Sequence, residues 1–405
     1  MRLAIDLRPL LEPYESGVTC YTKSMVKELL KKKDLELDLY YQARSRCEAI
    51  HSVFPTVRHL PLSNTRFHLR SLFGFPTLPD FYFLQKPDLI WIPDRRPFYK
   101  SDIPLVMTLH DRVPEFYRST LSLKGRLWHS LFPLRRLLQL CSGILVPTFT
   151  VGETLRSKLP KEVTYAGARL SKNQEIPERA RSLLKAPFFL MISPSDPRKR
   201  LHWFFQMAER FPKAHFAVIG LKPKESRFAT PRLAGLKKRA NIFLYPEVSD
   251  EEKSWFLHHA RALLALSRYE GFDLPVLEAV KARCPVIMSG ISVHHELYKT
   301  SAAFVNTLQE LEVALYRALE GTVQVPVPRG LYSWGKAADR ALFFFLRVLA
   351  NKNRKSGGHG NGHNHPHNAQ GLQPDEHGRN NDDGTETHGT AHHKRNKNVS
   401  FNLLK

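Results

Sequence analysis

Short runs of β-branched and aliphatic residues alternate with helix-like stretches along most of this chain. In the first part, runs typical of buried parallel strands lie at Arg2–Leu7, Leu35–Tyr40, Asp88–Ile92, Leu105–Leu109 and Gly143–Val146. The residues between them predict helices at Gly17–Lys31, Leu121–Leu140 and Thr148–Lys158. Because alternating strands and helices favour right-handed parallel crossovers, residues 1–170 are predicted to form one doubly wound α/β domain.

The same alternation starts again after a polar stretch, Lys161–Arg181. Strands are predicted at Pro187–Ser193, His215–Ile219, Asn241–Leu244, Ala262–Leu266, Pro285–Met288 and Ala302–Val305. Helices are predicted at Leu201–Phe211, Ser249–Ala260, Leu274–Ala282 and Leu308–Leu319. Residues 171–330 are thus a second predicted Rossmann-like domain, and residues 331–350 a helix that crosses back to the first. In such a pair, ligands bind in the cleft that the two domains form, at the carboxyl ends of the strands.

The end of the chain has a different composition. From Asn351 to Lys405 aliphatic residues are almost absent, whereas eight of the 19 histidines lie there. Such a segment cannot bury enough apolar surface to offset the entropy lost on ordering. Residues 351–405 are therefore predicted to be a disordered, His-rich tail.

The chain of 405 residues is strongly basic, with 61 Lys and Arg against 38 Asp and Glu, a net charge of +23. Lys and Arg exceed Asp and Glu by 26 to 16 in residues 1–170, by 27 to 17 in residues 171–351, and by 8 to 5 in the rest. This even spread, without a nucleic-acid-binding motif, argues against a nucleic-acid partner and leaves nucleotides and anionic lipid open. The four cysteines lack metal-ligand spacing, and no apolar run approaches the ~18–20 residues of a membrane span, so we expect a cytoplasmic protein.

The strongest chemical signal is a pair of glutamates, Glu270 and Glu278, after the predicted strand Ala262–Leu266. Pro275 suits the first turn of a helix, which predicts a helix start near Leu274. The free amides of that start form a natural diphosphate site, and the two carboxylates can reach different parts of one ligand. Motifs of dinucleotide-binding folds, P-loops, serine hydrolases and zinc proteases do not occur, nor does a D-x-D pair.

The segment Glu270-Gly-Phe-Asp-Leu-Pro-Val-Leu-Glu278 resembles the E-x7-E motif of the retaining GT-B glycosyltransferases of family 4, also called group 1. Other segments resemble this family in the same order along the chain. They are Ser16-Gly-Val, Val106-Met-Thr-Leu-His-Asp111, Gly143–Phe149, Ser193-Pro-Ser-Asp-Pro-Arg-Lys199, Val248-Ser-Asp-Glu-Glu252, Ser289–Glu296 and Ser333-Trp-Gly-Lys-Ala-Ala338. The resemblance implies the GT-B fold and the transfer of a hexose from a nucleoside diphosphate sugar to a glycan or lipid-linked acceptor hydroxyl, with retention.

The resemblance also implies roles for individual residues. Lys199, helped by Arg198, would neutralise the donor diphosphate, and Glu278 would accept hydrogen bonds from the ribose hydroxyls. Glu270 would face the donor sugar and stabilise the positive charge that develops on it. His110 would contact the donor sugar from the opposite domain.

Three further residues belong to the expected donor site. Gly17 would let the backbone approach the phosphates closely, and Phe272 and Leu274 lie in the donor-binding segment. No motif requires a metal or another cofactor. Asp273 stands where the family commonly has glycine, and it is predicted to cap the helix with its carboxylate and to repel a diphosphate.

The family's glycines are also replaced at Thr19 and Ser193, and these departures from the family pattern keep other functions open. They favour a non-catalytic homologue that binds a sugar nucleotide or glycan, and a GT-B-fold epimerase or phosphorylase is a further alternative. Nucleic-acid binding through the +23 charge is a third.

Two segments allow two interpretations each. The basic amphipathic stretch Arg118–Cys141 could rest on an anionic membrane, as a peripheral contact, or pack as an interdomain helix, which we favour. The aromatic run Arg66–Phe83 is either an acceptor-side loop or a packed excursion.

Overall fold

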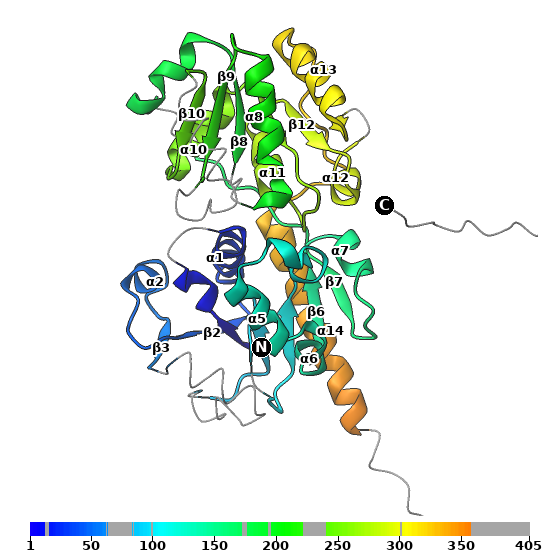
Figure 1. Cartoon of the computed structure of the whole chain (residues 1–405). Coiled ribbons are helices and arrows are strands. Elements are labelled where there is room, and N and C mark those ends of the chain that lie inside the picture. Colours follow the sequence, from blue (N-terminus) through cyan, green and yellow to red (C-terminus); the bar gives the residue numbers. More distant parts are fainter. Residues whose placement is uncertain are drawn as a thin grey trace, which may run out of the picture. The chain divides into compact units, whose positions relative to one another are not determined.

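A computed structural model describes residues 1–12, 16–61, 63, 83, 85–98, 100–171, 176–192, 196–221, 240–299 and 302–357 (Figure 1). Within these ranges the strands form two separate parallel sheets. The tail from residue 358, the turn at residues 193–195 and most of the run Arg66–Phe83 lie outside the described residues. The domain boundaries at residues 170 and 330 stay predictions.

The first sheet has seven parallel strands in the order β3-β2-β1-β4-β5-β6-β7. They are β1 (Arg2–Asp6), β2 (Glu36–Gln42), β3 (Arg58–Leu60), β4 (Leu89–Ile92), β5 (Leu105–Thr108), β6 (Gly143–Val146) and β7 (Lys161–Val163). The five predicted strands are confirmed, but the sequence pattern misses the edge strands β3 and β7. Each has three residues and mostly half-buried side chains, so neither makes a continuous apolar run. The interpretation of Lys161–Arg181 as a polar connection alone is therefore wrong at β7.

The second sheet has six parallel strands in the order β10-β9-β8-β11-β12-β13. They are β8 (Phe188–Ile192), β9 (His215–Ile219), β10 (Ile242–Tyr245), β11 (Ala262–Ala265), β12 (Val286–Ser289) and β13 (Ala303–Val305). All six are predicted by the sequence, because each contains a run of mainly apolar residues. This holds also for the edge strands β10 and β13, whose side chains are mostly half-buried.

Helices connect the strands of both sheets. They are α1 (Gly17–Leu29), α2 (Glu48–Val53), α4 (Val113–Phe116), α5 (Leu123–Leu131), α6 (Leu134–Gln139), α7 (Phe149–Glu153), α8 (Leu201–Arg210), α10 (Asp250–His259), α11 (Leu274–Lys281), α12 (Ser292–Leu297), α13 (Leu308–Leu319) and α14 (Trp334–Gly357). Short 3-10 turns lie at Arg8–Leu11, Arg118–Thr120, Glu178–Lys185 and Pro197–Lys199. Helix α10 begins with a capping box, in which Ser249 and Glu252 bond each other's backbone amides.

The single helix predicted over Leu121–Leu140 is wrong. The chain forms α5 and α6 instead and breaks at Pro133, because proline lacks an N–H and disfavours helical backbone in the residue before it. None of the residues of α5 is buried. The favoured interpretation of this stretch as a packed interdomain helix is therefore wrong for α5.

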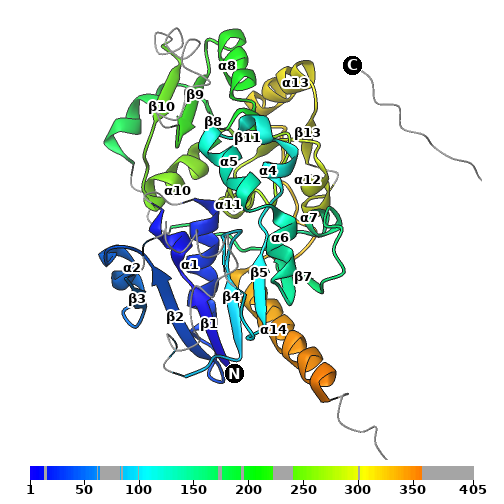
Figure 2. The same ribbon diagram turned by 60° about the horizontal axis from the view of Figure 1, so that its bottom comes forward.

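Helix α14, orange in Figures 1 and 2, packs against α1 and β7 of the first sheet. Its side chains Ala341, Phe344 and Phe345 are fully buried. A Cβ at Gly143 in β6 would lie 2.7 Å from the Phe344 ring, so the helix touches the sheet directly. The helix continues through Asn351, where the tail is predicted to begin, as far as Gly357. The predicted start of the tail is wrong, because residues 351–356 contain neither proline nor glycine to stop the helix.

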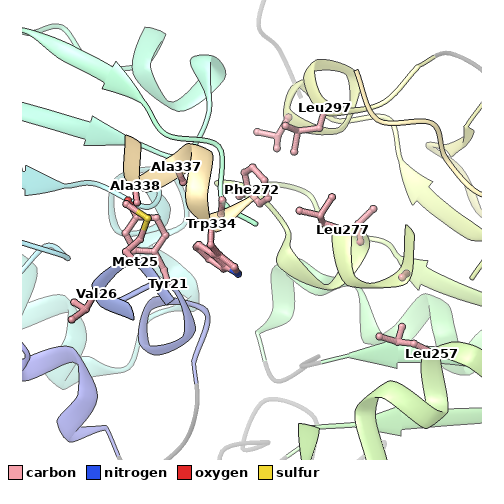
Figure 3. Packing of buried hydrophobic residues seen from close by; sticks show 14 of the residues in the cluster. Tyr21, Met25, Val26, Leu257, Phe272, Leu277, Leu297, Trp334, Ala337 and Ala338 are labelled. Carbon is pink, nitrogen blue, oxygen red and sulfur yellow. The ribbon is translucent and has the colours of Figure 1, made fainter. Parts of the chain in front are cut away.

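A continuous apolar cluster joins the elements of both sheets (Figure 3). The rings of Tyr21 in α1 and Trp334 at the start of α14 lie 5.9 Å apart, edge to face. Phe272, from the loop before α11, belongs to the same cluster and packs edge-on against Tyr332. In the part of the chain that the structure describes, every helix is too short or too polar to cross a bilayer.

Candidate functional site

The candidate site lies in the loop that leads from β11 into α11. Asp273, the residue that precedes the helix, has a left-handed backbone conformation with φ 67° and ψ 67°. A Cβ at Gly271 would lie 1.8 Å from the backbone oxygen of His110, at the end of β5. Position 271 therefore has no room for a side chain, and the loop presses directly on the first sheet.

Glu270 stands at the centre of a charged cluster. Its carboxylate is 2.5 Å from the Lys199 ammonium and 2.8 Å from the Arg198 guanidinium, and it accepts a hydrogen bond of 2.6 Å from the Ser267 hydroxyl. Glu270 is buried, and the Lys199 side chain is 16% exposed. The structure therefore brings Glu270, Lys199 and Arg198 together, as the sequence leads us to expect.

Arg198 is held on several sides. Its Nε donates to Asp196 at 3.0 Å, and Nη1 donates to the backbone oxygen of Tyr269 and to Glu270. Burial would lower the pKa of Arg198, but the carboxylates of Glu270 and Asp196 outweigh burial and raise it. Arg198 thus joins the turn after β8 to the loop before α11, while Lys199 is the more adaptable cation.

The predicted side-chain cap by Asp273 is wrong. Its carboxylate accepts no hydrogen bond from the first turn of α11 and instead accepts one of 3.1 Å from Nε2 of His294 in α12. Burial would raise the pKa of Asp273, but Lys199, His294 and Arg198 outweigh burial and lower it to about 2. The left-handed backbone points the side chain away from the helix amides, and it also explains why glycine suits this position.

Glu278 lies inside α11 and has a lysine partner that the sequence analysis missed. Lys253 of α10 donates to the Glu278 carboxylate at 2.9 Å, and Glu278 is 4% exposed. Burial would lower the pKa of Lys253, but Glu278 raises it to about 12. Lys253 directly follows the capping box Ser249–Glu252, and sequence spacing alone does not place it on α11. The pair orients the Glu278 carboxylate.

His110 lies on the first-sheet side of the site. Its Nε2 donates to the backbone oxygen of Pro93 at 2.7 Å, and its ring meets Tyr21 edge to face at 4.7 Å. Burial lowers the pKa of His110, so the imidazole is neutral near pH 7. Because Nε2 carries the proton, Nδ1 is the acceptor nitrogen.

The remaining predicted donor residues occupy different surroundings. Gly17 begins α1 behind Ser16, whose hydroxyl accepts from the Thr19 amide, and a Cβ at Gly17 would lie 3.9 Å from the Leu274 side chain. These two predicted residues therefore face each other from the two sheets. The ring of Phe272 is buried in the apolar cluster.

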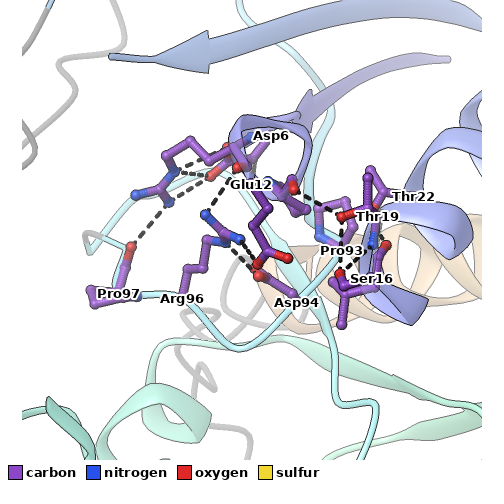
Figure 4. Close-up of polar contacts among 12 residues, drawn as sticks. Asp6, Glu12, Ser16, Thr19, Thr22, Pro93, Asp94, Arg96 and Pro97 are labelled. Atoms are coloured by element: carbon purple, nitrogen blue, oxygen red, sulfur yellow. Dashed lines mark hydrogen bonds and ion pairs between the residues drawn. The ribbon is translucent and has the colours of Figure 1, made fainter. Parts of the chain in front are cut away.

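A buried polar network follows β1 and β4, and the sequence analysis did not single it out (Figure 4). Asp6 and Arg8 form an ion pair of 2.5 Å with both side chains almost fully buried. Arg96 donates to the backbone oxygen of Arg8 at 2.9 Å and contacts Asp94 and Glu12. Alternating charges in adjacent loops are the only sequence signal for it. The network fixes the loops next to Gly17 and His110.

Two further contacts join the sheets around the site. Thr148 Oγ1 donates to the backbone oxygen of Gly271 at 2.9 Å. Glu296 of α12 accepts hydrogen bonds of 2.7 Å from the amides of Phe149 and Thr150, at the start of α7. The residues that the structure describes contain no group of three or more His, Cys, Asp or Glu side chains placed to hold a metal ion.

Two family models match this chain. Residues 16–171 match the family model of Glycosyltransferase Family 4, and residues 172–305 match that of glycosyl transferases group 1. The O-antigen chain mannosyltransferase RfbU of Salmonella typhimurium is 24% identical over 232 residues, which are 55% of this chain and 63% of that protein. The chain thus spans less than two thirds of the length of this relative.

Solved structures resemble the chain over most of its length. Sucrose-phosphate synthase from Thermosynechococcus elongatus has a TM-score of 0.60 at 14% identity, covering 88% of this chain and 98% of that one. Anabaena HepE in complex with UDP-glucose has a TM-score of 0.58 at 13% identity, covering 88% and 100%.

Two parallel doubly wound sheets, with a last helix returning to the first, make this a protein of the GT-B architecture. With both halves of the family matched from residue 16 to residue 305, the chain belongs to the group 1 glycosyltransferases of family 4.

Proposed function

We propose that the protein transfers a hexose from a nucleoside diphosphate sugar to a hydroxyl of a glycan or lipid-linked saccharide, with retention of configuration at the transferred carbon. The observation that carries this proposal is the buried contact of 2.5 Å between Glu270 and Lys199, next to the start of α11. It combines a cation for the diphosphate with a carboxylate for the sugar. The family membership supports the reaction class.

The charges of the cluster fit an anionic donor. Lys199 neutralises the diphosphate, both when the donor binds and when the diphosphate leaves with additional negative charge. Arg198 positions Glu270 and the loop, because its guanidinium is already bonded to Asp196 and Tyr269. Glu270 then faces the sugar and stabilises the positive charge of an oxocarbenium-like transition state. Glu278 accepts from the ribose hydroxyls.

A donor screen tests the proposal. The protein is incubated with UDP-, GDP- and ADP-hexoses and a glycan acceptor, and NMR identifies the anomeric configuration of any product. We expect one donor to be used with retention, and Glu270→Ala to reduce turnover strongly while nucleoside diphosphate affinity changes little. Turnover by Glu270→Ala at the parent rate, or an inverted product, contradicts the proposed chemistry.

A non-catalytic sugar-nucleotide-binding protein is the second candidate. The observation that favours it is the buried Asp273 carboxylate, because its negative charge acts on Lys199 and weakens the stabilisation that Lys199 can give to a leaving diphosphate. Donor hydrolysis separates the two candidates. Slow release of free sugar supports a transferase, and tight binding without release supports the binding protein.

We also propose a peripheral contact with an anionic membrane through α5, at the cytoplasmic face. Leu123, Leu127 and Leu131 are 81%, 62% and 41% exposed, and their spacing of four residues places them on one helix face. Between Glu115 and Glu153 the sequence has five Lys or Arg residues and no acidic residue. An exposed apolar stripe in basic surroundings suits an anionic lipid surface.

Vesicle sedimentation tests this contact. The parent should bind vesicles rich in phosphatidylglycerol and not pure phosphatidylcholine, and Leu123→Glu with Leu127→Glu should abolish binding. Leu184→Glu with Val313→Glu changes two other exposed apolar residues, 49% and 50% exposed, and serves as the matched control. Equal loss in both double variants would show that net charge, and not α5, governs binding.

A further inference from the structure

A second cavity lies away from the cluster around Glu270 and is unexplained by the proposed reaction. It has a volume of about 270 Å³ and opens where the end of β7, helix α12 and the start of α14 meet. Its walls therefore come from both sheets and from the segment that connects them. The side chains that matter for its chemistry are Tyr165, Glu296, Arg329, Tyr332, Lys336 and Arg340.

Two tyrosine rings form one wall of this junction cavity. Tyr165 and Tyr332 stack with their ring centres 5.4 Å apart and their planes 28° apart, and the Arg340 guanidinium lies 5.1 Å over the Tyr165 ring. Tyr165 has a left-handed backbone with φ 46°, a conformation that is unfavourable for a residue other than glycine. Such strain persists where the surrounding structure holds it, and functional sites are frequent places for it.

The positive charges of the cavity lack acidic partners among the described residues. Arg329 donates to the backbone oxygens of His295 and Tyr298, and Arg340 donates to the backbone oxygen of Val163. The ammonium of Lys336 forms no hydrogen bond or ion pair with the residues that the structure describes.

The one carboxylate in the cavity wall is already engaged. Glu296 accepts hydrogen bonds from the Phe149 amide at 2.7 Å and from the Thr150 amide and hydroxyl at 2.7 Å and 2.6 Å. These donors disperse its negative charge on the side of α7. Glu296 also accepts from the Tyr165 hydroxyl, and burial together with this carboxylate raises the pKa of Tyr165 to about 12. An anionic ligand would therefore meet three cations, with the one carboxylate placed at the tyrosine wall.

We propose that the junction cavity binds a small soluble phosphate monoester. Its phosphate contacts Lys336 and Arg340, whose charged donors suit a dianion, and its organic part rests on Tyr165 and Tyr332. The volume favours a compound of the size of a sugar phosphate, because pockets for larger ligands start at about 300 Å³. None of the lining residues belongs to the cluster around Glu270, which makes this site separate from the donor site.

Isothermal titration calorimetry of the full chain with mannose 6-phosphate, at about 0.15 M salt, tests the proposal. We expect the parent to bind, and Lys336→Ala with Arg340→Ala to bind at least about tenfold more weakly. Mannose without phosphate should not bind. The matched control is Lys185→Ala with Lys213→Ala, which removes the same charge from two exposed lysines elsewhere and should bind like the parent.

Three results would overturn the proposal. The first is equal affinity of the parent and the Lys336→Ala, Arg340→Ala variant, including no binding by either. The second is an equal loss in the Lys185→Ala, Lys213→Ala control, which would assign the effect to net charge. The third is loss of mannose 6-phosphate binding in Lys199→Ala, which would place the phosphate in the donor site. Because Lys199→Ala tests the donor site separately, the two proposals can fail independently.

Discussion

Asp273 shows how one backbone angle decides what a side chain does. Sequence reasoning treats an acidic residue before a helix as a cap, which requires extended backbone at that position. Here φ is 67°, so the carboxylate turns away from α11 and meets His294. Both nitrogens of His294 face acceptors: Nδ1 lies 2.8 Å from the Ser289 backbone oxygen, and Nε2 lies 3.1 Å from the Asp273 carboxylate.

Replacing Asp273 by asparagine tests how the negative charge of Asp273 acts on Lys199. Asp273→Asn keeps a hydrogen-bond partner for His294 but removes the negative charge next to Lys199, so UDP and GDP should bind more tightly by calorimetry. Folding lowers the pKa of Asp273 from 3.8 to about 2, so its contribution to stability is present above pH ~4 and is lost as the pH falls towards 2. The variant should therefore lose less stability than the parent between pH 5 and pH 3 in urea unfolding.

Asp339→Asn is the control for this experiment, because Asp339 is an exposed carboxylate paired with Lys32 on the surface. It should change neither nucleotide affinity nor the acid side of the stability profile. Weaker nucleotide binding by Asp273→Asn would mean that the carboxylate itself binds the donor.

Lys253 is the second residue whose role appears only in the structure. Lys253→Met removes the ammonium that holds the buried Glu278 carboxylate and leaves this carboxylate without its cation. We expect UDP and GDP affinity to fall about ten- to hundredfold, since a hydrogen bond to a charged group contributes about 1.5–3 kcal/mol. Lys31→Met, which breaks an exposed pair with Glu28, should leave affinity unchanged. Identical affinities of the two variants would remove Glu278 from the nucleotide site.

At the scale of elements, the residue types of a strand decide whether the sequence predicts it. The central strands of both sheets are apolar on both faces, and each is predicted to within two residues. The edge strands β10 and β13 are half-buried but apolar and are predicted as well, whereas β3 and β7 contain charged residues or histidine and make no apolar run. Pro133 marks the break after α5 in the sequence itself, and the predicted helix Leu121–Leu140 wrongly runs across it.

The loop before α11 gives a prediction at this scale. Gly271→Ala places a Cβ 1.8 Å from the His110 backbone oxygen, and a backbone atom cannot rotate away as a side chain can. The loop and the end of β5 must separate, so thermal unfolding should begin several degrees lower and transfer activity should be lost. Gly335→Ala, in helix α14, is the control. A Cβ at position 335 would have Glu28 Oε2 of α1 as its nearest neighbour, at 3.8 Å, so this substitution should be neutral or slightly stabilising. A Gly271→Ala protein as stable as the parent would contradict the close approach.

At the scale of the whole molecule, the sequence predicts the residues of the site better than their relations. The sequence identifies Glu270 from the motif before α11 and identifies Arg198 and Lys199 from the segment after β8. These segments meet because β8 and β11 are neighbouring parallel strands, whose carboxyl ends lie at the same edge of the second sheet. Lys253 and His294 carry no motif of their own. They reach the site because α10 and α12 pack beside α11, and helix packing depends on contacts far apart in sequence.

Helix α14 comes last among the described elements, after the second sheet, but it packs against the first sheet and therefore should stabilise it. A chain ending at Gly357 keeps the whole helix, and we expect its melting temperature to match that of the full chain. A chain ending at Leu342 loses Phe344, Phe345 and Val348, all of them buried against the first sheet, at about 1.5–3 kcal/mol each. The apolar cluster between α8, α13 and the second sheet contains no residue of α14. Calorimetry of the shorter chain should therefore show an early transition from the first sheet and a later one near the original temperature. A single transition at the parent temperature would mean that α14 does not stabilise the first sheet.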